Sequence, residues 1–253
     1  MAEVLHTGQL VLPGSLTAST GYVGYWPCAQ PTSDANLQDR SGKGNHMTFG
    51  SALTGSLAYA TAGYLQTYTD GSNLKHVVLP KAAAPASDQS WLLFFRIKGP
   101  APGATDILAG NAFSTSSQHV GFYLRSLTTG RLDMRIITTG FSDAGVSSPL
   151  ETVLDNSAEH TVAITYDAPT TTVDIYIDGV WSEVAHTVQA VVMDHANTLD
   201  FFLGGRNTDG HNGTWRDIHW IKKSGSLPTR IANIVRLMHA HPYHRLSTAE
   251  WPA

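Results

Sequence analysis

The segment 160–181 constrains the fold of this chain more than any other part of the sequence. It reads HTVAITYDAPTTTVDIYIDGVW, and β-branched or aromatic residues recur at every second position in two runs, 161–166 and 173–177. A period of two predicts strands that each bury one face. Between and after the runs stand Asp-Ala-Pro-Thr at 167–170 and Asp-Gly at 178–179, which are typical of turns joining antiparallel strands. The segment therefore predicts two adjacent strands of an antiparallel sheet.

Short apolar runs separated by glycine, proline and polar residues continue along the rest of the chain. One helix is predicted over about 227–241, because Pro228 suits a first helical turn and apolar residues recur at helical spacing from Ile231 to Met238. Many short strands with one short C-terminal helix predict an all-β fold, an antiparallel sandwich of two sheets. The predicted strands are 22–26, 64–68, 76–79, 91–98, 106–109, 120–126, 131–138, 161–166, 173–177, 198–203 and 216–222.

The composition supports one sizeable core and excludes several classes of protein. The chain has 253 residues, 42% of them hydrophobic, which suits a single β-sandwich domain. Only 14% are charged and the net charge is −4, so the chain lacks the basic surface that binds nucleic acid. The one cysteine, Cys28, cannot form a disulfide within the chain and is predicted to be a small buried residue.

The N-terminal region is predicted to lie outside the main domain. Residues 1–20 hold glycines and a proline around one short apolar run and are expected to form an arm, with a single domain over 21–253. The region lacks the basic and apolar parts of a signal peptide. No stretch approaches the roughly 20 apolar residues that span a bilayer. We therefore expect synthesis in the cytoplasm, no standard export signal and no membrane insertion.

Three motifs in order along the chain together resemble one known fold family. The first joins Tyr-Trp-Pro at 25–27 to an Asp-Arg-Ser-Gly-Lys-Gly-Asn-His loop at 39–46, the second is 160–181, and the third joins Leu-Gly-Gly at 203–205 to 213–221. In this order they resemble the concanavalin A-like jelly-roll superfamily, in its laminin-G-like branch. The resemblance covers 22 to about 235 and implies a two-sheet antiparallel jelly roll. It is much less specific for function, because the fold carries lectins, glycosidases, adhesion modules and viral coat parts.

The resemblance implies a carbohydrate site on a polar, glycine-rich loop that precedes the last strand. Lectin sites on this fold often use such loops, where Asn and Asp bond sugar hydroxyls and an aromatic ring stacks on the sugar. The candidate carbohydrate-binding residues are Asn207, Asp209, His211, Asn212 and Trp215. The alternative is a solvated loop followed by a tryptophan of the core.

The resemblance also implies a calcium site between the Gly-Asn loop and an aspartate of the last strand. The matching positions are Asp39, Asn45 and Asp217, with the backbone carbonyl of Gly42 assisting. Calcium takes roughly six to eight oxygen ligands, so carboxylates, amides and carbonyls are the expected donors. Lys43 departs from the pattern, since a cation would not help. The alternative is that Asp39 and Asn45 make turn hydrogen bonds and Asp217 bonds a loop amide.

The sequence argues against a glycosidase. Polysaccharide-cleaving members of the family carry a Glu-x-Asp-x-Glu run whose carboxylates share one cleft, and no such run occurs here. Asp174 and Asp178 share a face across Tyr176, but Asp178 belongs to the predicted turn and Asp174 is expected to face solvent. We therefore predict that the chain is not an enzyme.

Three functional hypotheses follow. The first is a non-catalytic structural or attachment protein of a phage virion, as a capsid decoration or tail-associated protein, with other virion proteins as partners and a homo-oligomer such as a trimer as its assembly. It combines an adhesion-type fold, no export signal, no disulfides and the arm at 1–20. A virion protein leaves the host cytoplasm by lysis. The second hypothesis, compatible with the first, is a carbohydrate-binding lectin module, and the third and least favoured is a glycoside hydrolase.

Overall fold

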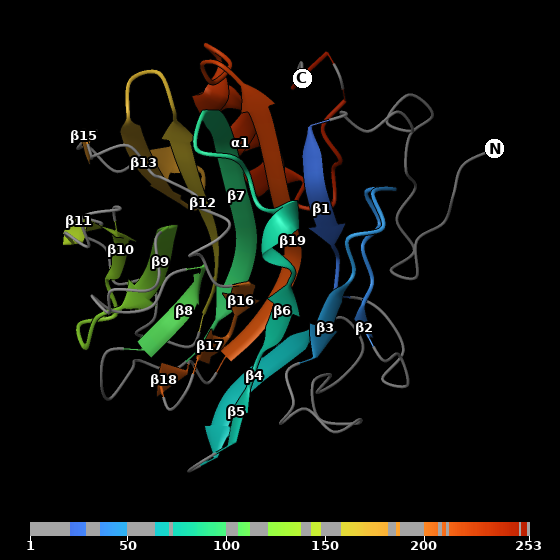
Figure 1. Ribbon diagram of the computed structural model, residues 1–253, viewed down its shortest axis with the longest axis vertical. Coiled ribbons are helices and arrows are strands. Elements are labelled where there is room, and N and C mark those ends of the chain that lie inside the picture. The colour runs from blue at the N-terminus through green and yellow to red at the C-terminus, as the bar shows by residue number, and fades with distance from the viewer. Residues whose placement is uncertain are drawn as a thin grey trace.

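The computed structural model contains two antiparallel β-sheets packed face to face, with one short helix near the C-terminus (Figure 1). This confirms the predicted all-β jelly-roll sandwich. The predicted arm at 1–20 lies outside the residues that the structure describes and stays a prediction. The described residues are 21–28, 36–49, 64–70, 73–99, 106–111, 121–137, 143–147, 158–181, 186–187, 200–206, 209–210, 213–247 and 249–251.

The larger sheet has the strand order β14-β13-β12-β7-β19-β4-β5, with β1 also pairing β19 and β15 pairing β13. Its strands are β1 (Tyr22–Trp26), β4 (Leu65–Asp70), β5 (Asn73–Lys75), β7 (Gln89–Lys98), β12 (Glu159–Asp167), β13 (Thr172–Ile177), β14 (Val180–Trp181), β15 (His186–Thr187) and β19 (Gly213–Ser224). The predicted hairpin of segment 160–181 is formed by β12 and β13, with Ile164 opposite Ile175. The hairpin therefore lies at one edge of the larger sheet, with β14 outermost.

The smaller sheet has the order β11-β10-β9-β8-β16-β6-β3-β2. Its strands are β2 (Asn36–Leu37), β3 (Met47–Phe49), β6 (Val77–Leu79), β8 (Asp106–Gly110), β9 (Gly121–Ser126), β10 (Leu132–Ile137), β11 (Asp143–Ser147) and β16 (Phe201–Leu203). A separate ribbon pairs β17 (Gly205–Arg206) with β18 (Asp209–Gly210), and a 3-10 turn, η1, covers Lys81–Ala83.

The main core lies between the two sheets and follows the alternation that the sequence predicted. On β7, Trp91, Leu93, Phe95 and Ile97 are all at most 1% exposed and belong to one buried cluster. Burying such a side chain contributes about 1.5–3 kcal/mol relative to leaving it in water. Cys28 is also fully buried, as predicted, and burial raises the pKa of its thiol.

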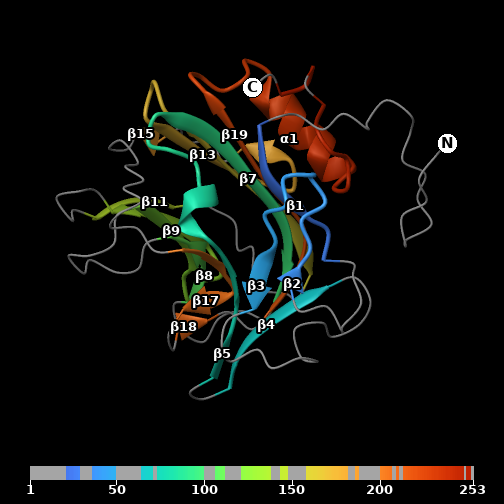
Figure 2. The ribbon, with the colours of Figure 1, turned by 45° about the vertical axis from the view of Figure 1, so that its right-hand side comes forward.

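The opposite, outer face of the larger sheet is covered in part by the C-terminal helix α1 (Ile231–Ala240) (Figure 2). Figure 2 places α1 beside β7 and β19, on the side away from β8 and β9. Phe94 of β7 and Met238 of α1 are both fully buried in this second cluster. The helix begins at Ile231, later than predicted, and before it the backbone N–H of Leu227 donates to Asp167 Oδ1 at 2.7 Å at the end of β12. No helix in the described part of the chain is long and apolar enough to cross a bilayer.

Candidate functional site

The polar loop that was predicted to bind sugar is only partly described. Asp209 lies in β18, where it pairs with Arg206 of β17. Asn207, His211 and Asn212 fall outside the described residues, so their predicted role stays a prediction.

Trp215 does not have the position that was predicted for it. It lies on β19, is 0% exposed, and its ring centroid is 5.1 Å from that of Phe95 in the core between the sheets. Its Nε1–H donates to Thr67 Oγ1 at 2.8 Å. A buried ring cannot stack on a sugar, so the prediction for Trp215 is wrong and the alternative, a tryptophan of the core, is correct.

The loop predicted to bind calcium is closed by its own hydrogen bonds. Asp39 Oδ1 accepts the backbone N–H groups of Tyr25, at 2.9 Å, and Ser41, at 2.7 Å. Asp39 Oδ2 accepts the Ser41 hydroxyl at 2.9 Å and the Asn45 backbone N–H at 3.1 Å. The Asn45 side-chain amide donates to the Val23 carbonyl at 2.7 Å. The bonds of Asp39 to Ser41 and Asn45 are local to the loop, as the alternative explanation expects, whereas those to Tyr25 and Val23 tie the loop to β1.

Asp217, the third predicted calcium ligand, is paired with a guanidinium group. It occupies a bulge of β19 with φ 48°, and its Oδ2 accepts Arg96 Nε–H at 2.7 Å and contacts Arg96 Nη2. Burial raises the pKa of the Asp217 carboxyl, and the Arg96 charge opposes that rise. Calcium would have to displace this cation. Among the described residues no group of three or more His, Cys, Asp or Glu is arranged to hold a metal. The calcium site predicted from Asp39, Gly42, Asn45 and Asp217 stays a prediction, which the ion pair between Asp217 and Arg96 disfavours.

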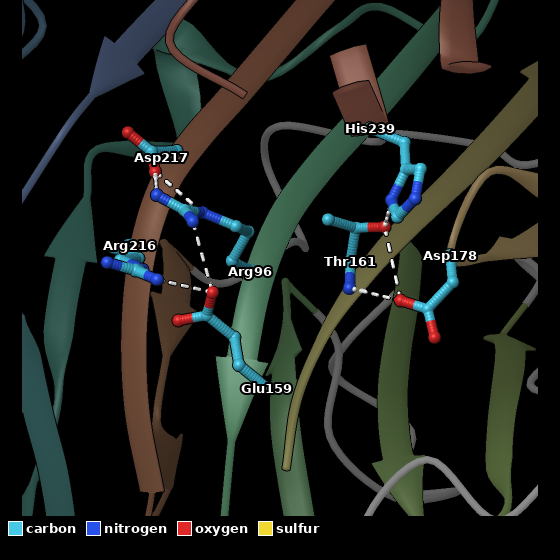
Figure 3. Close-up of polar contacts among 7 residues, drawn as sticks. All are labelled: Arg96, Glu159, Thr161, Asp178, Arg216, Asp217 and His239. Atoms are coloured by element: carbon cyan, nitrogen blue, oxygen red, sulfur yellow. Dashed lines mark hydrogen bonds and ion pairs between the residues drawn. The ribbon is translucent and has the colours of Figure 1, made fainter. Parts of the chain in front are cut away.

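Arg96 also belongs to a charged network on the outer face of the larger sheet (Figure 3). Its Nη1 lies 3.0 Å from Glu159 Oε1, and Arg216 Nη2 lies 2.5 Å from the same oxygen. The Arg216 guanidinium lies over the Tyr64 ring, 4.8 Å from its centroid. Two cations and two carboxylates balance, so this network stabilises β7, β12 and β19 and offers no excess charge to a ligand.

A second polar group joins β12 to α1 and to the β13–β14 turn (Figure 3). Thr161 Oγ1 lies 2.7 Å from His239 Nδ1, and the Thr161 backbone N–H donates to Asp178 Oδ1 at 2.9 Å. Asp178 Oδ2 lies 2.7 Å from His160 Nδ1. In a nucleophilic triad the carboxylate orients the imidazole that serves as base. Here the carboxylate contacts Thr161 and a different histidine, and Thr161 is 7% exposed, so the group is a structural connection.

One aromatic side chain on the described surface stands apart from the rest. Trp181 on β14 is 44% exposed, and it and Val180 are the exposed large hydrophobic residues of the described chain. Its indole N–H donates to Asp174 Oδ1 at 3.0 Å. Trp181 lies opposite Tyr176, and Asp174 lies two residues before Tyr176 on β13, so ring and carboxylate share the outer face. We call Trp181 and Asp174 the edge platform.

The edge platform combines the two elements with which proteins hold a sugar. An indole presents an apolar face for the C–H groups of a sugar ring, and a carboxylate accepts hydrogen bonds from hydroxyls. Within the described part of the chain, Asp174 accepts a hydrogen bond through Oδ1 and none through Oδ2. Sequence reasoning placed Asp174 at the solvent but missed Trp181. The available signal was a large aromatic residue directly after an Asp-Gly turn, at a position with no predicted strand to cover it.

Comparisons with known proteins agree with the fold. Residues 69–223, more than half of the chain, match the family profile of the concanavalin A-like lectin/glucanases superfamily. None of the curated protein sequences compared with the chain is significantly similar.

The solved structures similar to this chain include binding domains of toxins. The binding domain of botulinum neurotoxin DC in complex with SialylT has a TM-score of 0.64 at 12% identity, covering 88% of this chain and 52% of that chain. A structure of botulinum neurotoxin type C, whose cell entry depends on two ganglioside molecules, has a TM-score of 0.63 at 11% identity, covering 88% and 51%. The binding domain of Paraclostridial Mosquitocidal Protein 1 has a TM-score of 0.60 at 12% identity, covering 87% and 52%. The chain thus spans about half the length of these structures, and the likeness shows a shared fold.

Proposed function

The chain belongs to the concanavalin A-like lectin/glucanase superfamily, and on that basis we propose that it is a non-catalytic attachment module that binds carbohydrate through the edge platform. The observation that carries the proposal is the exposed Trp181 ring with its N–H bonded to Asp174. The toxin binding domains with the same fold, one of them solved with SialylT, support an attachment role of this general kind.

The hydrogen bond distinguishes Trp181 from an ordinary exposed hydrophobic residue. Single apolar residues on a surface are common and need no explanation. Trp181, however, is held by a carboxylate on the neighbouring strand, so less rotational freedom is lost when a ligand stacks on it. A preorganised ring beside an available acceptor is what a sugar-binding surface requires.

The same contacts oppose a hydrolytic role. A retaining glycosidase needs two carboxyl groups about 5 Å apart that are free to act as nucleophile and acid. Asp174 accepts the Trp181 indole N–H, and Asp178 is bonded to the Thr161 N–H and to His160. Both oxygens of Asp178 are thus engaged within the protein, so Asp174 lacks the second available carboxylate that this mechanism requires.

A glycan array with matched variants tests the proposal. Trp181→Ala removes the ring, whereas Val180→Ala truncates the adjacent residue, which is 61% exposed and points to the opposite face of the sheet. We expect Trp181→Ala to weaken binding by about fivefold or more, and Val180→Ala to leave it within about twofold, since stacking on an aromatic ring contributes on the order of 1 kcal/mol. Equal binding by the wild type and Trp181→Ala, with both proteins folded, would refute the edge platform as the site.

We further propose that the module works on a phage virion, at the capsid or tail, as a homo-oligomer made in the host cytoplasm. A binding fold whose one cysteine is buried and needs no oxidising compartment supports this location. Neighbouring genes that encode portal or capsid proteins, and detection of the protein in purified particles by mass spectrometry, are the expected results. Particles that lack the protein, from a phage that encodes it, would exclude the virion location.

A further inference from the structure

We infer that the edge platform selects uncharged sugars and discriminates against sialylated or other acidic ones, an inference that rests on the proposed function. The juxtaposition behind it is the carboxylate of Asp174 bonded directly to the stacking ring of Trp181. A sugar that stacks on the ring would therefore lie close to this carboxylate.

Asp174 can offer a ligand only acceptor oxygens. Its Oδ1 holds the indole N–H, and Oδ2 remains for a hydroxyl or an acetamido N–H of a sugar. A carboxylate or sulfate on the ligand would meet a like charge at the same position. Juxtaposed like charges at a partly exposed site lower affinity by about tenfold.

The charges around the platform point the same way. Tyr176, the cross-strand neighbour of Trp181, has a hydroxyl on which both Asp174 and Arg236 of α1 act. Burial raises the pKa of Tyr176 to about 12, Asp174 adds to the rise, and Arg236 opposes it with the smaller effect. At the Tyr176 hydroxyl the effect of Asp174 is therefore larger than that of Arg236.

Arg236 supplies the competing possibility. It is exposed on α1, and a guanidinium group is a good partner for the carboxylate of an acidic sugar. It is not bonded to the platform ring, whereas Asp174 is. An acidic glycan would therefore have to reach Arg236 while its ring lies beside the Asp174 carboxylate.

The decisive experiment compares pairs of glycans that differ only by a terminal sialic acid, with binding measured by titration calorimetry. We expect the wild type to bind the neutral member at least tenfold more tightly. Asp174→Asn keeps an acceptor for the indole N–H and removes the charge, so it should shrink that ratio to about twofold. Arg236→Gln should leave the preference for the neutral glycan unchanged.

Salt provides a second readout that needs no variant. Raising NaCl from about 20 mM to about 500 mM screens exposed charges and should strengthen binding of the acidic glycan to the wild type while leaving the neutral glycan unaffected. Preference for the sialylated member, abolished by Arg236→Gln, would overturn the inference.

The two proposals fail in different ways. If Trp181→Ala binds as well as the wild type, or no glycan is bound at all, the proposed function fails and the inference fails with it. If binding depends on Trp181 but favours acidic glycans, the function stands and the inference alone is refuted.

Discussion

His219 shows how one buried side chain can tie distant parts of the chain together. It is fully buried on β19, stacks on Tyr25 with ring centroids 4.2 Å apart, and its Nε2 lies 2.7 Å from the Pro242 carbonyl. The carbonyl can only accept, so Nε2 carries the proton, and Nδ1, 3.2 Å from Tyr22 Oη, accepts the tyrosine O–H. The Tyr22 oxygen in turn accepts the Leu246 N–H at 2.9 Å. The bond that Nδ1 accepts from the Tyr22 O–H requires a neutral imidazole, because a protonated ring has no acceptor nitrogen.

This requirement predicts acid sensitivity. Burial lowers the pKa of His219 from 6.5 to about 3, with the bond to Pro242 opposing the shift. Below pH 6.5 the unfolded chain therefore binds a proton at this residue that the folded chain does not. The free energy of unfolding should fall by about 1.4 kcal/mol per pH unit from this residue alone, until about pH 3.

Urea denaturation of the wild type and His219→Phe between pH 7 and pH 4 measures this contribution. The variant loses two hydrogen bonds and should be less stable at pH 7 by about 1–3 kcal/mol for each polar group left unpaired. Its stability should decline less steeply below pH 6.5, because it has one titrating group fewer. If the free energy of unfolding falls equally in the two proteins between pH 7 and pH 4, the prediction is wrong.

Arg96 and Arg216 illustrate why two arginines on one network are not equivalent. The Arg96 side chain is 15% exposed. It pairs with Glu159 and with Asp217, whose side chain is 6% exposed. Arg216 is 27% exposed and pairs with Glu159, which keeps Arg96 as a second partner. Removing Arg96 thus leaves a buried carboxylate uncompensated, whereas removing Arg216 does not.

Substituting each arginine by methionine keeps most of the side-chain volume and isolates this difference. Arg96→Met should lower the free energy of unfolding by about 3–5 kcal/mol, the range for breaking a buried ion pair. Arg216→Met should cost about 1 kcal/mol or less, as for partly exposed pairs. Thermal or chemical denaturation of both variants gives the comparison, and equal losses would show that Asp217 does not depend on Arg96.

At the level of elements, the C-terminal tail forms part of the fold. Leu246 and Trp251 are both 0% exposed against the outer face of the larger sheet, and the Trp251 Nε1–H donates to the Lys222 carbonyl at 3.1 Å. Glu250 accepts the N–H and hydroxyl of Ser247, at 2.7 and 2.8 Å, and so fixes the last turn before Trp251. Helix α1 and this tail together cover part of the outer face of the larger sheet.

Trp251→Ala should therefore destabilise the whole domain. Loss of a fully buried tryptophan costs about 3–5 kcal/mol through lost burial and the cavity left behind. Glu250→Gln, one residue earlier, keeps the packing and weakens hydrogen bonds, so it should cost about 1 kcal/mol. Denaturation midpoints of the two variants test the difference, and an undiminished midpoint for Trp251→Ala would mean that the tail is dispensable.

The elements also show which parts of the structure the sequence could predict. Period-two patterning gave β12, β13 and the Asp-Gly turn, because those signals lie within a few residues of each other. The contact of His239 with Thr161 joins residues far apart in sequence, and no local pattern encodes it. The same holds for Asp217, whose partner Arg96 comes from another strand, so the sequence did not indicate this ion pair.

At the scale of the whole molecule, the position of a strand in the sheet decided which tryptophan is exposed. Trp215 follows a polar loop but lies on β19, which has β7 on one side and β4 on the other, and the alternation turns its ring into the core. Trp181 follows a short turn but lies on β14, at the end of the strand order. A polar loop can be recognised from local sequence. The order of strands in a sheet cannot, because it depends on pairings between strands that are distant in the sequence. The exposed tryptophan therefore lies at the edge of the larger sheet, on β14, and not beside the polar loop at 206–213.

A site built on one exposed ring also predicts how the assembled molecule binds. One stacking residue and one acceptor group bury little of a sugar, so a single site should bind a soluble monovalent glycan with a Kd on the order of 1 mM, or about 4 kcal/mol. Several copies acting on one surface raise the overall affinity by about 10²–10⁴, provided that the sites face the same way. Attachment by this module therefore requires the predicted homo-oligomer.

Light scattering after gel filtration should find more than one chain per particle, and surface plasmon resonance should show binding that strengthens steeply with glycan density. A monomer whose affinity is the same on sparse and dense surfaces would contradict the prediction, and Trp181→Ala should abolish the density dependence without changing the mass.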